Sequence, residues 1–254
     1  MSFVLSPEIA ARFAPKIRLV ATDMDGTLTR SGKFTSALFE AFARLGRSQI
    51  EVLIVTGRSA GWVSGLAHYL PIWGAIAENG GLLYRSDREF PISLIPIADP
   101  IAHRQNLARV FEFLKRDFPH LQESADNQFR VTDWTFDVRG LSEEDLQRLS
   151  AACRERGWDF IYSTVQCHIK LPAQEKALAI GQVLRDYFPE FDRDRVVTVG
   201  DSPNDRSLFD PTNFPHSVGV ANIADYLQQL PYAPAYITEG PEGEGFCELV
   251  RYLT

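Results

Sequence analysis

Two aspartates one residue apart follow the first strongly apolar stretch of the chain, in the sequence L-V-A-T-D-M-D-G-T-L-T at residues 19–29. Residues two apart on an extended chain point the same way, so the carboxylates of Asp23 and Asp25 can reach one ligand. Two charges this close raise each other's cost of ionisation unless a cation or a reaction uses them. Taken alone, the motif fits a solvated turn at Gly26 about as well as a site, because short motifs carry a real risk of false positives.

Three further apolar runs end in polar residues that suit phosphate or a metal ion. They end in T-G-R-S at 56–59, E-N-G-G at 78–81 and G-D-S-P-N-D at 200–205. In open α/β sheets, ligands bind beyond the carboxyl ends of the strands. We therefore expect these groups to share one cleft with Asp23 and Asp25.

The T-G-R-S segment permits two explanations. A hydroxyl at Thr56, together with backbone N–H groups at the start of the following helix, would make a small anion site. Alternatively, Thr56 or Ser59 merely caps that helix, which is the better explanation when the segment is considered alone.

The segment at 200–205 has the pattern of an ordinary helix start. Ser202 is placed as the N-cap, Pro203 as the first helical residue and Asp205 as the third. This explanation leaves out Asp201, another acid at the end of an apolar strand. With Asp23, it would supply hard oxygen ligands that suit Mg²⁺, with water and a substrate phosphate completing the shell.

A lysine near the start of a later helix is a candidate phosphate ligand. The helix dipole mildly disfavours a positive charge at the position of Lys176, and a lysine placed there could neutralise a bound phosphoryl group. A solvated surface lysine is the commoner outcome for this residue type. Lys170 is a rival, although it lies within an expected strand.

The elements that would position these residues alternate between strands and helices. Continuous apolar runs suit parallel strands covered on both faces, and we expect strands at residues 17–22, 50–56, 74–77, 196–200, 217–220 and 235–237. Helical spacing lies between them, at residues 36–46, 60–70, 174–188 and 225–230. This alternation predicts an α/β fold with a doubly wound parallel sheet.

The middle of the chain breaks this rhythm. Helices are expected there at 100–118 and 142–157, and strands with alternating apolar residues at 129–138 and 160–171. Such alternation is typical of strands with one packed and one exposed face. We therefore expect a smaller α/β domain at 89–172, inserted into a core formed by 1–88 and 173–254. Several polar residues on or beside the inserted strands could face a substrate, although a solvated surface is the commoner outcome for any one of them: Arg130, Asp133, Arg139 and His168.

Composition excludes several classes of function. The net charge is −7 and lysine or arginine blocks are absent, which argues against nucleic-acid or anionic-membrane binding. Three scattered cysteines argue against a disulfide scaffold or a zinc site and fit a reducing compartment. The first residues lack the pattern of a signal peptide. We expect a cytoplasmic protein, a monomer or weak homodimer, whose partner is a small phosphorylated metabolite.

Together these motifs resemble those of the haloacid dehalogenase superfamily of phosphohydrolases. D-M-D-G-T-L at 23–28, Thr56, Lys176 and G-D-S-P-N-D at 200–205 are similar to its four motifs, in the same order. The insert lies between the second and third motifs, as in the type IIB subclass of the Cof and sucrose-phosphatase type. A-E-N-G-G at 77–81 and H-S-V-G-V-A-N at 216–222 also resemble that subclass. One departure is Ala177, where the family usually has glycine.

The resemblance implies a Rossmann-like core with an α/β cap, and Mg²⁺-dependent hydrolysis of a small, sugar-like phosphate. Asp23 would be the nucleophile that forms an aspartyl-phosphate. Asp25 would protonate the leaving alcohol and then activate water.

The same resemblance implies which residues bind the metal and the substrate. The metal would be held by Asp23, the Asp25 carbonyl, Asp201 and Asp205. The phosphoryl oxygens would be bound by Thr56, Gly57 and Lys176. On the substrate side we expect Arg58, Asn79 and Asn204.

Three alternatives remain open at this point. Some relatives with this cap are phosphosugar mutases, which return the phosphoryl group to a sugar. A non-catalytic protein that binds a phosphorylated metabolite would keep the fold without turnover. A signalling receiver domain also uses Asp, Thr and Lys, but it explains neither Asp25 nor an insert of about eighty residues in a domain of ordinary size.

Overall fold

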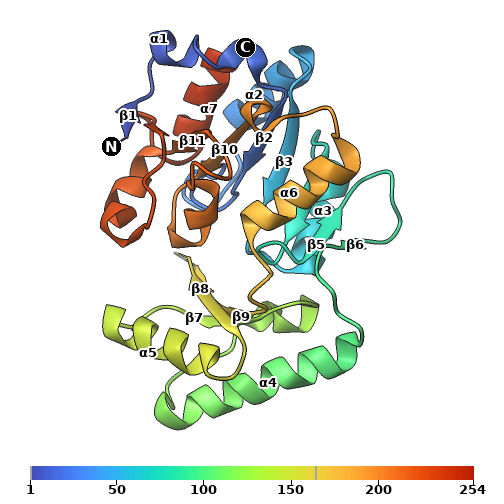
Figure 1. The fold of residues 1–254 in the computed structure, drawn as a ribbon, viewed down its shortest axis with the longest axis vertical. Helices are drawn as coiled ribbons and strands as arrows, with labels where there is room; N and C mark the ends of the chain where they lie inside the picture. The colour runs from blue at the N-terminus through green and yellow to red at the C-terminus, as the bar shows by residue number, and fades with distance from the viewer. Residues whose placement is uncertain (1, 164) are drawn as a thin grey trace.

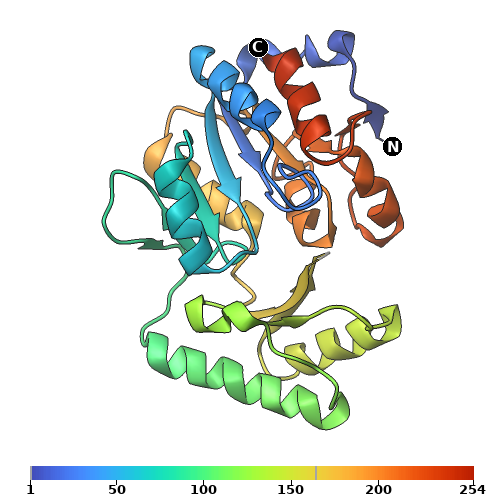
Figure 2. The same ribbon diagram turned by 180° about the vertical axis from the view of Figure 1, so that it is seen from behind.

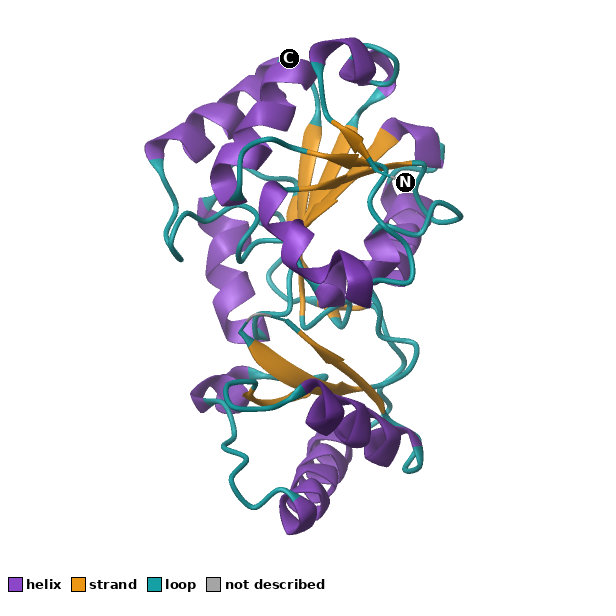
Figure 3. Cartoon of the chain, turned by 90° about the vertical axis from the view of Figure 1, so that its left-hand side faces the viewer, coloured by secondary structure: helices purple, strands orange, loops and turns teal. Residues whose placement is uncertain are grey.

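The computed structural model describes residues 2–163 and 165–254, which form two sheets with their helices. The larger sheet has nine strands and the smaller has three. Figures 1 and 3 show them stacked along the long axis, with the smaller unit at the bottom. We call this smaller unit the cap and the rest the core.

The nine-stranded sheet is parallel except at one edge. Its strands lie in the order β1-β12-β11-β10-β2-β3-β4-β5-β6. The antiparallel pairings are those of β5 with its two neighbours, β4 and β6. The strands are β1 (Phe3–Val4), β2 (Leu19–Thr22), β3 (Glu51–Val55), β4 (Gly74–Ala77), β5 (Leu82–Tyr84), β6 (Ile92–Ser93), β10 (Val196–Gly200), β11 (His216–Gly219) and β12 (Tyr236–Ile237).

Helices cover both faces of this sheet. They are α1 (Pro7–Ala10), α2 (Ser36–Arg47), α3 (Ala60–Tyr69), α6 (Lys176–Tyr187) and α7 (Glu242–Leu253). Short 3₁₀ segments complete the core at Ala14–Lys16, Arg193–Arg195, Pro203–Leu208 and Ala221–Gln229. Figure 2 shows α2 and α7 side by side on the face opposite to α6.

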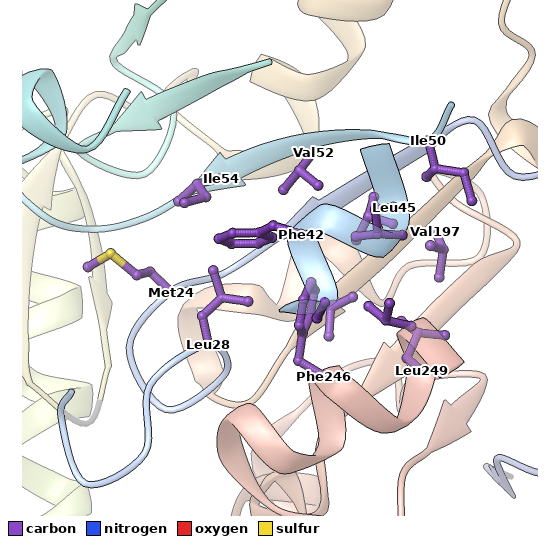
Figure 4. Packing of buried hydrophobic residues seen from close by; sticks show 14 of the residues in the cluster. Met24, Leu28, Phe42, Leu45, Ile50, Val52, Ile54, Val197, Phe246 and Leu249 are labelled. Atoms are coloured by element: carbon purple, nitrogen blue, oxygen red, sulfur yellow. The ribbon is translucent and has the colours of Figure 1, made fainter. Parts of the chain in front are cut away.

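Side chains of alternate residues in the central strands pack into two separate apolar clusters, one on each face of the sheet. Val52, Ile54 and Val197 pack with Phe42 of α2 and Phe246 of α7 (Figure 4). The neighbouring strand residues, Leu19, Ala21, Leu53 and Val55 among them, pack under α6 on the other face. Because both faces are buried, these strands are continuous apolar runs.

The cap is a three-stranded antiparallel sheet with two helices on one face. Its strands are β7 (Trp134–Asp137), β8 (Asp159–Tyr162) and β9 (Gln166–Lys170), in the order β7-β9-β8. Its helices are α4 (Pro100–Asp117) and α5 (Glu143–Arg154), with a 3₁₀ segment at Ala125–Phe129. In β9, Cys167 and Ile169 enter the apolar cluster under the helices. The alternate residues Gln166, His168 and Lys170 are buried as well.

The α/β class and the doubly wound parallel sheet are confirmed. The domain division stays a prediction, with one shift at its edge, because β6 at Ile92–Ser93 pairs with β5 in the core sheet. No helix within residues 2–163 and 165–254 has the length and apolar character needed to cross a membrane.

Several expected elements differ in detail. Only residues 134–137 of the expected strand at 129–138 form a strand, because residues 130–132 turn onto the core instead. The run at 160–171 is two strands of a hairpin. The expected helix at 225–230 belongs to a 3₁₀ segment. Helix α7 was not predicted from the sequence, because its glycines disfavour a helix. At Gly243, a Cβ would lie 2.9 Å from the Leu28 carbonyl oxygen, so this close approach needs a glycine.

Candidate active site

The polar ends of four neighbouring strands meet at one edge of the core sheet. Strands β2 and β10 pair in register, and the Asp23 N–H donates to the Val199 carbonyl at 2.9 Å. The residue after β2 is therefore Asp23 and the residue after β10 is Asp201, side by side. Thr56 follows β3 on the other side, and Glu78 follows β4. The expected convergence at the carboxyl ends of the strands is what the structure shows.

Three buried aspartates form a compact cluster. Carboxylate oxygens of Asp23, Asp201 and Asp205 all lie within 4.8 Å of one another. Asp201 accepts hydrogen bonds from the Thr27 hydroxyl and from Asn222 Nδ2, each at 3.0 Å. These contacts fix the orientation of Asp201 within the cluster.

Asp205 both begins a helical segment and belongs to the acid cluster. Its Oδ2 accepts from the backbone N–H groups of Asp201 and Ser202 at 3.0 and 3.1 Å. Together with Ser202 this makes the expected capping box, here on the 3₁₀ segment Pro203–Leu208. The other oxygen, Oδ1, faces Lys176. Both explanations of this segment therefore apply: Asp205 begins a helical segment, and it also belongs to the acid cluster.

The crowded carboxylates suit a bound cation. Burial raises the pKa of Asp23 to about 8, with Asp205 and Asp25 adding to the effect and Lys176 opposing it. Burial and the charges of Asp23 and Asp205 also raise the pKa of Asp201. A divalent cation held by hard carboxylate oxygens would restore the ionised forms, so the donor set fits Mg²⁺.

Lys176 is the lysine that reaches the cluster. It is the first residue of α6, is buried, and its Nζ lies 2.5 Å from Asp23 Oδ1 and 2.7 Å from Asp205 Oδ1. Burial alone would lower the pKa of Lys176, but Asp205 and Asp23 hold it above its ordinary value. Lys170 instead donates to Asp159 Oδ2 at 2.8 Å. The structure brings Lys176, and not Lys170, to the nucleophile candidate.

Asp25 turns away from the acid cluster and pairs with Arg58. Arg58 Nε and Nη2 donate to the two carboxylate oxygens of Asp25 at 2.9 and 2.6 Å. The guanidinium also lies 5.0 Å from the centre of the Trp62 ring. The side chain of Asp25 therefore lies outside the acid cluster and is oriented by Arg58.

The Thr56 loop is not held by an ordinary serine or threonine cap. Thr56 Oγ1 accepts from the Arg58 N–H at 3.1 Å, and Ser59 occupies the N-cap position of α3 without capping through its side chain. The capping acceptor is Glu78, whose Oε1 accepts from the Ala60 N–H at 2.8 Å. The hydroxyls of Thr56 and Ser59 are therefore free of the capping role that the sequence suggested for one of them.

Comparison with known proteins finds similarity to one family of hydrolases. Residues 20–103 match the model of the haloacid dehalogenase-like hydrolases. A phosphoglycolate phosphatase of Methanothrix thermoacetophila is 25% identical over 93% of this chain and 97% of its own. The superfamily and the class of enzyme expected from the motifs, a phosphatase, are confirmed.

Solved structures agree on the fold of this hydrolase. A protein of Thermoplasma acidophilum superposes with a TM-score of 0.75 at 21% identity, covering 93% of this chain and 98% of its own. The sucrose-phosphatase of Synechocystis, solved with sucrose and phosphate, gives a TM-score of 0.70 at 15% identity, covering 92% and 97%. Both matches extend over the core and the cap.

The cap of this hydrolase covers the site. The cleft between them is lined by Asp23, Asp25, Thr56, Gly57, Arg58, Ser163, Val165, Gln166, His168, Ser202 and Asn204. The empty space between these residues is about 300 Å³, part of it open to solvent. This is at the small end of the range for ligand pockets.

Asn79 and Asn204 lie together beside this cleft. Ser202 Oγ donates to Asn204 Oδ1 at 2.6 Å, and Asn204 Nδ2 donates to Asn79 Oδ1 at 3.1 Å. Asn79 Nδ2 is buried and has no hydrogen-bond partner. Asn204 therefore lines the cleft, and Asn79 contacts it and approaches Gly57 with one donor unused.

Four residues lie at the site although the sequence did not assign them to it. Asn222 and Thr27 orient Asp201, although both lie in segments that resemble the family. Glu78 lay in a segment noted only for its polarity. The fourth, His168, could face a substrate by its position, but a solvated surface was the favoured prediction; it is buried and lines the cleft. A period-two pattern shows that two faces differ, and it does not show that the polar face will be covered.

Proposed function

We propose that this chain is a Mg²⁺-dependent phosphomonoesterase that hydrolyses a small phosphate ester through an aspartyl-phosphate on Asp23. One observation carries the proposal: Asp23 belongs to the acid cluster, contacts Lys176 and lines the same cleft as Asp25 and Thr56. A nucleophile, a cation site, a phosphate cradle and a proton-transfer group then surround one point.

The metal would be held by the side chains of Asp23 and Asp201, by the Asp25 carbonyl and, directly or through water, by Asp205. When bound, it neutralises charge on the transferring phosphoryl group and favours the ionised form of Asp23. Lys176 supplies a second positive charge at the same place. Thr56, with the backbone of Gly57, holds phosphoryl oxygens where charge develops.

The chain's own groups then carry two steps. Asp23 bonds to phosphorus while the bond from phosphorus to the leaving oxygen breaks, and Asp25 gives its proton to that oxygen. A water molecule then loses a proton to Asp25 and bonds to phosphorus, which releases Asp23 and inorganic phosphate. Asp25 ends as it began, protonated.

For the substrate we propose a small, sugar-like phosphate. The narrow cleft and the polar face of the cap sheet support a small hydrophilic leaving group. The relative from Methanothrix is named for phosphoglycolate, and a structural neighbour for sucrose phosphate. Both are small phosphate esters with polar leaving groups.

The proposal is tested by phosphate release from p-nitrophenyl phosphate. Hydrolysis should require Mg²⁺, stop on chelation and fall by at least about 10³-fold in Asp23→Asn, because the covalent route is lost. Asp117→Asn, an exposed aspartate at the end of α4, is the matched control and should keep wild-type activity. Wild-type activity in Asp23→Asn would refute the assignment of the nucleophile.

The two alternatives give different products. Phosphosugar mutase activity would convert a sugar phosphate to its isomer without releasing inorganic phosphate. A non-catalytic binding protein would bind phosphate esters and leave them intact with Mg²⁺ present. Chromatography of the products, with a phosphate assay on the same samples, distinguishes all three.

A further inference from the structure

A buried chain of polar groups crosses from the cap to the cleft. Arg130 Nη1 donates to both carboxylate oxygens of Asp133, at 2.9 and 3.1 Å, and to the Gly57 carbonyl at 3.0 Å. Asp133 Oδ2 in turn lies 2.8 Å from His168 Nδ1. The side chains of Arg130 and Asp133 are fully buried and that of His168 is 1% exposed. The position of the imidazole is therefore fixed by a paired carboxylate.

This arrangement decides which ring nitrogen of His168 carries hydrogen. Nδ1 faces a carboxylate, which only accepts, so Nδ1 is the donor. Arg130 pairs with Asp133 and also with Asp126. Burial lowers the pKa of His168, against the opposing effect of Asp133. The ring is therefore neutral at neutral pH, and Nε2 is left as a hydrogen-bond acceptor.

His168 Nε2 lies next to Gly57 of the Thr56 loop, close to the unpaired donor Asn79 Nδ2. A Cβ added to Gly57 would lie 3.1 Å from His168 Nε2 and 3.2 Å from Asn79 Nδ2. Asn79 is 2% exposed, and its Nδ2 has no partner. His168 also lines the cleft with Asp23 and Asp25. An acceptor from the cap and a donor from the core thus flank the same glycine.

We propose that His168 and Asn79 form a subsite for a hydroxyl group of the leaving alcohol, close to the ester oxygen. A hydroxyl can donate to His168 Nε2 and accept from Asn79 Nδ2 at the same time. A carboxylate would satisfy Asn79 and leave Nε2 facing a second acceptor, and an alkyl group would satisfy neither. The substrate class is therefore a polyol or sugar phosphate. Asp133 is a positioning residue that acts through His168.

This inference rests on the proposed function and deepens it. It predicts a difference between substrates rather than an overall rate. A neutral hydrogen bond changes affinity by about 3–10-fold, so glycerol 3-phosphate should exceed propyl phosphate in kcat/KM by about tenfold. Phosphoglycolate, with a carboxylate at the same place, should also fall below glycerol 3-phosphate.

The test compares this substrate preference in variants. In His168→Leu the preference for glycerol 3-phosphate over propyl phosphate should fall to about one, and His168→Gln, whose side-chain oxygen can accept, should recover part of it. His120→Leu, at an exposed position of the cap, should keep the wild-type preference. Equal losses on both substrates in His168→Leu, or a wild-type preference near one, would overturn the proposal.

A binding measurement separates this inference from the proposed function. Calorimetry on Asp25→Asn, with Mg²⁺, gives the affinity for glycerol 3-phosphate and propyl phosphate without turnover. If the wild-type chain releases no phosphate but the tenfold affinity difference is present and disappears with His168→Leu, the function fails and the subsite stands. If phosphate is released without any such difference, the function stands and the subsite fails.

Discussion

Arg58 and Asp25 are joined by two hydrogen bonds, one to each carboxylate oxygen, at 2.9 and 2.6 Å. A planar guanidinium fixes a carboxylate in this way, which an ammonium group cannot do. The pair orients the side chain of Asp25. It must loosen when Asp25 carries a proton to the leaving oxygen, so the effect of Arg58 should depend on the leaving group.

We expect Arg58→Ala to lower kcat by about 10²-fold for an alkyl phosphate, because a proton-transfer group that is misplaced by an ångström loses about this much. The loss should be below about fivefold for p-nitrophenyl phosphate, whose leaving group needs little protonation. Arg58→Lys should recover only part of the loss. The control is Arg47→Ala, which removes the arginine of an exposed pair with Glu40. Equal losses on the two substrates would contradict an orienting role.

The two buried lysines provide a matched pair of variants. Lys176→Met should lower kcat by about 10²–10³-fold, because it removes positive charge where the transferring group develops negative charge. Lys170→Met should cost less than about tenfold, since Lys170 pairs with Asp159, which Arg206 also approaches at 3.8 Å. Steady-state kinetics with one substrate decides between them. A larger loss in Lys170→Met would show that the wrong lysine has been assigned to the phosphate.

Two aspartates of the cap, both paired with arginine, should differ in their effect on stability. Asp133→Asn should reduce the free energy of unfolding by about 1–3 kcal/mol, because it weakens the buried contacts to Arg130 and His168 and leaves Asp126 as the remaining carboxylate of Arg130. Asp137→Asn should change it little, since its partner Arg139 is 87% exposed and the pair is screened by water. Urea unfolding followed by fluorescence measures both. Similar values for the two variants would show that burial does not set the strength of these pairs.

The buried state of His168 should make stability depend on pH. Burial lowers the pKa of His168 in the folded chain from its ordinary value of 6.5. Below about pH 6.5 the unfolded chain therefore binds a proton that the folded chain does not, and the free energy of unfolding falls as pH drops, by at most about 1.4 kcal/mol per pH unit. His168→Gln should lose less stability than the wild type between pH 7.5 and 5.5. His120→Gln should behave as the wild type does, and an unchanged slope in His168→Gln would rule out this origin.

The catalytic edge of the core was predictable because its evidence is local in sequence. Asp23, Thr56 and Asp201 each follow a continuous apolar run, and a parallel sheet brings such ends together by geometry alone. The choice of Lys176 over Lys170 was left open, because it depends on where α6 begins relative to β2 and on the direction of β9. Only the structure supplies that relation.

The cap was harder to predict because its polar residues have two possible environments. Arg130, Asp133 and His168 look like surface residues in an alternating strand, and Arg139 is one. The first three are buried because the cap sheet turns its polar face toward the core. The packing of one sheet against another unit is a long-range property, and the alternation of residues along one strand does not contain it.

The side chain of Glu78 connects the core to the cap. Its carboxylate accepts from the Ala60 N–H at 2.8 Å and from the Thr132 N–H and hydroxyl, each at 2.6 Å. The Glu78 carboxylate thus caps helix α3, which follows the Thr56 loop, and it also anchors the cap. The cap of this chain therefore cannot be exchanged freely for a foreign one. A chimaera that brings in a foreign cap without donors at the place of Thr132 would leave Glu78 short of partners and disturb the loop that the new cap was meant to serve.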